Sequence, residues 1–115
     1  MSNNINKLEN LHFLELRELL LYNNNITDIQ VLAKVKFTKL EKLALGENII
    51  SNIDILENVN FIELKVYNNN ISDIKVFEKV KFTKLEKLDL RKNNIDKTKS
   101  HSTLELLKSK IISNL

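Results

Sequence analysis

Apolar and polar residues alternate in four short stretches of the chain, at residues 16–21, 40–45, 61–66 and 85–90. Alternation with a period of two predicts a β-strand that has one apolar and one polar face. The four stretches begin 24, 21 and 24 residues apart. Because one such strand cannot bury its apolar face alone, we expect the copies to stack into a parallel sheet with a continuous core.

An internal duplication underlies this regularity. Residues 22–48 and residues 67–93 are identical at 20 of 27 positions. Three of the seven differences, Ala44/Asp89, Gly46/Arg91 and Glu47/Lys92, lie in the predicted strands or just after them, where the leucine positions are unchanged. This is what a diversified recognition surface would show, and drift at exposed positions would produce the same result.

Each 45-residue unit contains two copies of the pattern L-x-x-L-x-L-x-x-N-x-I, whose asparagines are Asn24, Asn48, Asn69 and Asn93. The pattern resembles the leucine-rich repeat, in the short form found in phosphatase-regulating and internalin-like proteins, over roughly residues 5–98. The resemblance implies an α/β solenoid with a short curved parallel sheet on its concave face and 3₁₀ or short helical segments on its convex side. The asparagine amides are expected to satisfy turn backbone groups along the stack.

The remaining segments fit a single leucine-rich repeat domain over residues 1–115. Residues 1–15 are expected to form a partial N-terminal repeat, residues 16–98 four repeats, and residues 99–115 a C-terminal cap. Ser102 and Glu105 have the spacing of a capping box, and apolar residues follow at helical spacing, so we predict an amphipathic helix over residues 103–113. The first strand, around Glu18–Tyr22, is expected to present an open sheet edge.

Two outward rows of this predicted sheet have distinct chemistry. Glu18, Lys42, Glu63 and Lys87 alternate in sign, which favours a ladder of weak ion pairs. Tyr22, Gly46, Tyr67 and Arg91 place a glycine between two rings, so we expect a gap there that a partner side chain enters, or a simple stacking of Arg91 on Tyr67. The candidate binding residues, taken from this row and its neighbour, are Leu20, Tyr22, Lys65, Tyr67, Asp89 and Arg91.

Composition argues against several classes of protein. The chain has no cysteine and one glycine, which excludes disulfides, thiolate metal sites and glycine-rich phosphate loops. No apolar run is long enough to span a bilayer, and no secretory signal is visible. The net charge is +3, but sixteen of the eighteen basic residues are lysines, which disfavours sequence-specific recognition of nucleic acid.

Candidate catalytic groups are sparse. His12 and His101 are far apart in the sequence, and Asp28 and Asp73 have the position of residues that satisfy local turn amides. We therefore expect no enzyme activity, no catalytic residue, no cofactor and no metal ion. The expected function is a protein-interaction module that is monomeric and cytoplasmic and binds through its concave face; an extracellular location stays open. Alternatives are a regulatory subunit of an enzyme such as a phosphatase, an adhesin-like surface role, and self-assembly through the first strand's edge.

Overall fold

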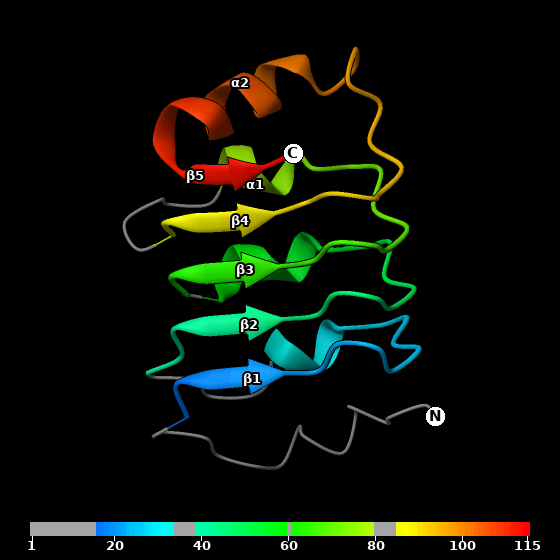
Figure 1. The fold of residues 1–115 in the computed structure, drawn as a ribbon, viewed down its shortest axis with the longest axis vertical. Coiled ribbons are helices and arrows are strands. Elements are labelled where there is room, and N and C mark those ends of the chain that lie inside the picture. The colour runs from blue at the N-terminus through cyan, green and yellow to red at the C-terminus, as the bar shows by residue number, and fades with distance from the viewer. Residues whose placement is uncertain (1–15, 34–38, 60, 80–84) are drawn as a thin grey trace.

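The computed structural model describes residues 16–33, 39–59, 61–79 and 85–115, and these residues form one parallel sheet backed by short helices. Five strands lie in chain order across the sheet and run in the same direction (Figure 1). The strands are β1 (Glu18–Leu20), β2 (Lys42–Ala44), β3 (Glu63–Lys65), β4 (Lys87–Asp89) and β5 (Ile112–Asn114).

A second layer of short helices lies along one face of the sheet, and the longest and last of the helices lies at the β5 end of the stack (Figure 1). Each helix connects one strand to the next, and neighbouring helices are in contact along the stack. The four are η2 (Gln30–Ala33), η3 (Asp54–Asn58), α1 (Val76–Lys79) and α2 (His101–Lys110), of which the first two are 3₁₀ helices. The chain thus forms the predicted solenoid, with the other face of the sheet left for the outward rows.

The strand register agrees with the alignment of the repeats. Leu43, Leu64 and Leu88 are paired across β2, β3 and β4 and are at most 2% exposed. They point into a single apolar core between the sheet and the helices, which also buries Phe77 of α1. The first and third residues of each strand point to the opposite face, away from the core. The register therefore confirms the two predicted outward rows that lie within the strands.

The C-terminal segment differs from the prediction. The helix over residues 103–113 was expected to be the last element, but α2 spans His101–Lys110 and is followed by β5. Ile111 has an extended backbone (φ −140°, ψ 163°), and the Ile112 amide donates to the Glu86 carbonyl at 2.8 Å. Residues 112–114 therefore pair with the edge of β4 instead of continuing the helix. This pairing satisfies backbone N–H and C=O groups of β4 that a longer helix would leave without a partner.

The predicted capping box was also wrong. Ser102 lies within α2, and the residue that precedes the helix, Ser100, makes no side-chain capping hydrogen bond. The helix is held instead by its apolar face, where Leu104 and Leu107 are buried. Tertiary packing thus set the helix start two residues before the position that the local sequence pattern favoured.

Several expectations fall on residues that lie outside the described part of the chain. These are the partial repeat at residues 1–15, the phenylalanine stack of Phe13, Phe37 and Phe82, and whatever lies against the outer edge of β1. They stay predictions.

Candidate functional site on the concave face

The ends of the strands are held by buried asparagine side chains. The Asn48 amide nitrogen donates to the Leu45 carbonyl at 2.9 Å within its own repeat and to the Leu21 carbonyl at 3.0 Å in the preceding one. Its carbonyl oxygen accepts from the amides of Asn24 and Ile26, both at 2.9 Å. Asn69 and Asn93 repeat this arrangement one and two repeats later. The predicted structural ladder is confirmed, and it makes the backbone behind the concave face rigid.

The two repeated aspartates act locally, as predicted. An oxygen of Asp28 accepts a hydrogen bond from the Gln30 amide at 2.8 Å, and Asp73 accepts one from the Lys75 amide at 2.9 Å. Both carboxylates therefore stabilise the turn that leads to a convex helix.

The first outward row carries an ion pair at its centre. Lys42 of β2 and Glu63 of β3 are cross-strand neighbours, and their charged atoms are 3.2 Å apart. Both side chains are partly shielded from solvent, with 31% and 21% of their surface exposed. This is the part of the predicted charge ladder that the structure shows, and it leaves Glu63 occupied.

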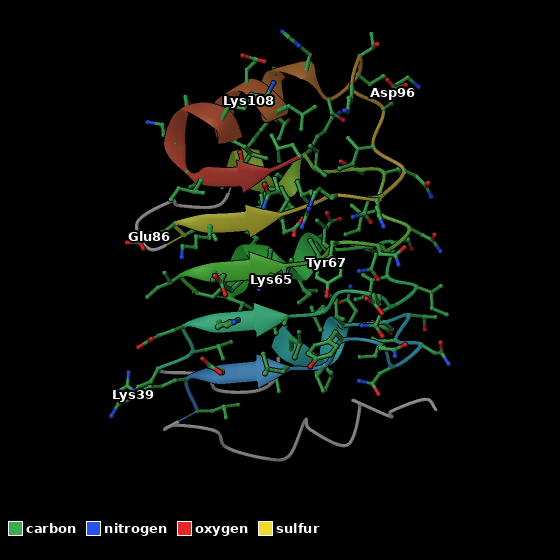
Figure 2. The ribbon with its side chains drawn as sticks, viewed as in Figure 1. Lys39, Lys65, Tyr67, Glu86, Asp96 and Lys108 are labelled. Carbon is green, nitrogen blue, oxygen red and sulfur yellow. The ribbon has the colours of Figure 1, made fainter. Side chains whose placement is uncertain are left out.

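Tyr67 fills the gap that was expected between the two tyrosines. A methyl group added at Gly46 would lie 2.5 Å from Cζ of Tyr67, so the ring covers the glycine. The glycine therefore serves to admit the Tyr67 ring, and the expectation that a partner side chain enters this gap was wrong. Figure 2 shows Tyr67 just beyond the end of β3, on which Lys65 lies.

Arg91 is held by Asp89. Its Nε donates to one carboxylate oxygen at 3.0 Å, and a terminal nitrogen donates to the other at 2.7 Å. This paired hydrogen bond lowers the pKa of Asp89, against the effect of burial, and raises the pKa of Arg91. The Asp89 side chain is only 10% exposed, whereas that of Arg91 is 61% exposed. Asp89 thus positions the arginine, while Arg91 offers its outer surface to solvent.

The six predicted binding residues divide into two groups. Leu20 and Tyr22 form an exposed apolar area at the β1 end, with 48% and 53% of their surface accessible. Lys65, Tyr67, Asp89 and Arg91 lie on or directly after β3 and β4. A hollow of about 210 Å³ opens there between Tyr67 and Arg91, and is also lined by Glu47, Asn68 and Lys92.

The strand β5 was not predicted from the sequence. Ile112 and Asn114 extend the first and second outward rows beyond Lys87 and Asp89. Leu115 occupies the position that Leu90 has one repeat earlier, which was an available signal. Lys110 and Ser113 stand where that repeat has Leu85 and Leu88, so the leucine pattern is broken and the strand escaped detection.

Within the described ranges, the side chains and helices show neither a cluster for a metal ion nor a membrane-spanning helix. That part of the chain brings together no three His, Cys, Asp or Glu side chains that could share a metal ion. It also contains no helix with the length and apolar character needed to cross a membrane.

Comparison with known proteins agrees with this architecture. A family model for leucine-rich repeats, covering two copies, matches residues 14–58. No curated protein matches the sequence.

The solved structures that are similar to this chain include two leucine-rich repeat or internalin proteins. Internalin C2 of Listeria monocytogenes is 28% identical, with a TM-score of 0.65 over 83% of this chain and 39% of that protein. A leucine-rich repeat protein of Leptospira interrogans is 26% identical, with a TM-score of 0.66 over 89% of this chain and 26% of that protein. This chain spans less than half the length of either protein. Leucine-rich repeats generally mediate protein–protein interactions. The repeats, the sheet register and these likenesses together show that the chain has the fold of a leucine-rich repeat solenoid.

Proposed function

We propose that this chain is a non-enzymatic interaction module that binds a protein partner through its concave face. The observation that carries the proposal is the exposed apolar pair Leu20 and Tyr22 at the β1 end of the outward face of the sheet, next to the charged residues of β2 and β3. Exposed apolar area rimmed by polar residues is typical of protein-binding surfaces, and tyrosine is enriched at their energetic centres.

Rigidity supports the same function. The asparagine ladder and the parallel register fix the backbone before any partner arrives, so that binding orders little of this chain. Arg91 is similarly fixed by Asp89, which lowers the entropy lost when its exposed side contacts a partner.

The size of the face limits its affinity. Five strands at a spacing of about 4.8 Å make a sheet about 19 Å wide between its outer strands. A standard interface buries about 800 Å² on each partner, so a partner held by this face alone binds weakly. Tighter binding requires contacts to the strand-end loops as well.

The test compares a double variant and a control variant in the capture of a partner from cell lysate. Leu20→Ser/Tyr22→Ala removes the exposed pair, whereas Ile49→Ser removes an apolar side chain of similar exposure, 46%, that lies outside the strands. We expect a protein that is captured by the unchanged chain and by Ile49→Ser but lost with the double variant. Equal capture by all three would contradict the proposal.

Self-association is a second candidate, favoured by the position of β5. Among the described residues, β5 pairs only with β4, and Ile112 is 69% exposed beside that edge. An open strand edge is a template for another chain. Light scattering that shows a concentration-dependent mass, abolished by Ser113→Pro, would support this reading. An enzyme such as a phosphatase among the captured proteins would instead support the alternative of a regulatory subunit.

A further inference from the structure

A second hollow on the concave face lies between β3, β4 and β5. Its volume is about 210 Å³, and β5 contributes Ile112 and Asn114 to its lining. Its charged lining residues are Glu63, Lys65, Lys87, Asp89 and Arg91, and Leu64 and Leu88 also line it. Arg91 also lines the hollow beside Tyr67, so the two hollows share this arginine.

The charges around this hollow do not cancel. Glu63 is paired with Lys42 at 3.2 Å, and Asp89 is paired with Arg91 at 2.7 Å. Lys65 and Lys87 form no ion pair with any residue that the structure describes. Lys65 faces Asp89 and Lys87 faces Glu63 across the strands, but each of these carboxylates already has a closer cation. The three cations that line the hollow, Lys65, Lys87 and Arg91, outnumber its two carboxylates by one, and this excess favours an anionic partner.

An exposed apolar side chain adjoins these lysines. Ile112 is the cross-strand neighbour of Lys87 and has 69% of its surface accessible. Burying it would add favourable apolar contact next to the two charges. The combination suits a ligand with an anionic group and an apolar group a few ångströms apart.

We propose that this hollow binds an acidic segment of a protein partner. A carboxylate of the segment lies between Lys65 and Lys87, and a neighbouring aliphatic side chain covers Ile112. This inference rests on the proposed function, since it assigns the chemistry of a partner to one part of the concave face.

The geometry favours a protein segment over other anions. Pockets for small molecules are usually about 300–1,000 Å³, larger than this open hollow. The residues that line it include no aromatic ring on which a base could stack, and its one arginine is held by Asp89. A side chain presented by a polypeptide fits both the size and the charge.

Three short peptides of equal length test the chemistry by NMR titration of the labelled full chain. Their centres are Glu-Leu-Glu, Glu-Ser-Glu and Lys-Leu-Lys. We expect the first to shift the amide signals of β3, β4 and β5 with a dissociation constant of about 1 mM or below. The serine peptide should bind about threefold more weakly, and the lysine peptide should give no shifts at these strands.

Matched variants locate the site. Lys65→Gln/Lys87→Gln should weaken binding of the first peptide about five- to tenfold, because two charge-assisted contacts are lost. Lys75→Gln/Lys99→Gln removes the same charge from two exposed lysines that do not line the hollow and should change binding less than about twofold. Ile112→Ser should weaken binding about threefold. These neutral substitutions avoid placing a new carboxylate opposite Asp89, and the amide spectrum reports whether each variant is folded.

Four results would overturn the inference. They are equal losses in the two lysine variants, equal binding of the serine peptide, no shifts from the first peptide at about 1 mM, and larger shifts of the same amides by single-stranded oligothymidylate. Failure here is distinct from failure of the proposed function. Loss of lysate capture with Leu20→Ser/Tyr22→Ala but not with Lys65→Gln/Lys87→Gln would reject only the acidic-segment site.

Discussion

At the residue scale, the same backbone conformation recurs after each of the first four strands. Asn23, Glu47, Asn68 and Lys92 all have positive φ, between 55° and 60°. This left-handed region is unfavourable for residues other than glycine, but asparagine adopts it more readily than glutamate or lysine does. The backbone strain at this position is therefore greater in the second and fourth repeats, which have Glu47 and Lys92, than in the first and third, which have asparagine.

Replacing the two strained residues should stabilise the protein. We expect Glu47→Asn and Lys92→Asn each to raise the free energy of unfolding by about 0.5 kcal/mol, measured by urea denaturation. The reverse change, Asn68→Glu, should lower it by a similar amount. If both asparagine variants lowered the free energy of unfolding, the side chains of Glu47 and Lys92 would stabilise the protein by more than the backbone strain destabilises it.

At the element scale, asparagine side chains reinforce the backbone hydrogen bonds that join neighbouring repeats. The strands have only three residues each, but backbone pairing continues beyond them, for example from the Glu47 amide to the Tyr67 carbonyl at 2.9 Å. The Asn69 amide nitrogen bridges the Leu45 and Val66 carbonyls, and its oxygen accepts from the Ile50 amide at 3.0 Å. A single polar side chain thus satisfies backbone groups in two successive repeats.

Removing the Asn69 side chain should destabilise the protein far more than removing the side chain of the adjacent Asn70. Asn69→Ala leaves several buried backbone groups without a partner, so we expect a loss of about 3 kcal/mol in the free energy of unfolding. Asn70 is exposed, and its backbone hydrogen bond to Ile50 survives substitution, so Asn70→Ala should cost less than about 0.5 kcal/mol. Similar unfolding midpoints for the two variants would mean that water replaces the bridge.

At the scale of the whole molecule, each helix and strand that the structure describes contacts only its neighbours in the stack. Contacts between helices run from η2 to η3, then α1, then α2, and contacts between strands follow the same order. Such a stack is approximately one-dimensional, so a local defect should affect the adjacent repeats most.

Two buried leucines test this prediction. Leu107 of α2 lies at the C-terminal end of the stack and Leu64 of β3 near its centre, and neither is exposed. Replacing either with alanine should cost about 2–5 kcal/mol. In hydrogen exchange, Leu107→Ala should lower protection first in α2 and β5, while β2 and β3 stay protected; Leu64→Ala should lower it throughout. Uniform loss of protection in both variants would indicate that the solenoid unfolds as a single unit.

Much of the candidate surface could be read from the chain, but its contacts could not. The rows that contain Leu20, Lys65 and Asp89 follow from period-two alternation, which specifies the face of each residue. Whether Arg91 meets Tyr67 or Asp89 depends on side-chain rotamers and burial, which alternation does not encode. The position of Tyr67 over Gly46 was missed for the same reason.

The repeat, the parallel stacking, the register of four strands and the asparagine ladder all follow from the sequence, because each depends on residue types at fixed local spacing. That residues 112–114 form β5, and that a hollow lies between β3, β4 and β5, emerges only from the folded structure. The physical reason is that β5 has no leucine pattern of its own. It forms because β4 presents unpaired backbone groups, and a strand of almost any composition that reaches such an edge can satisfy them.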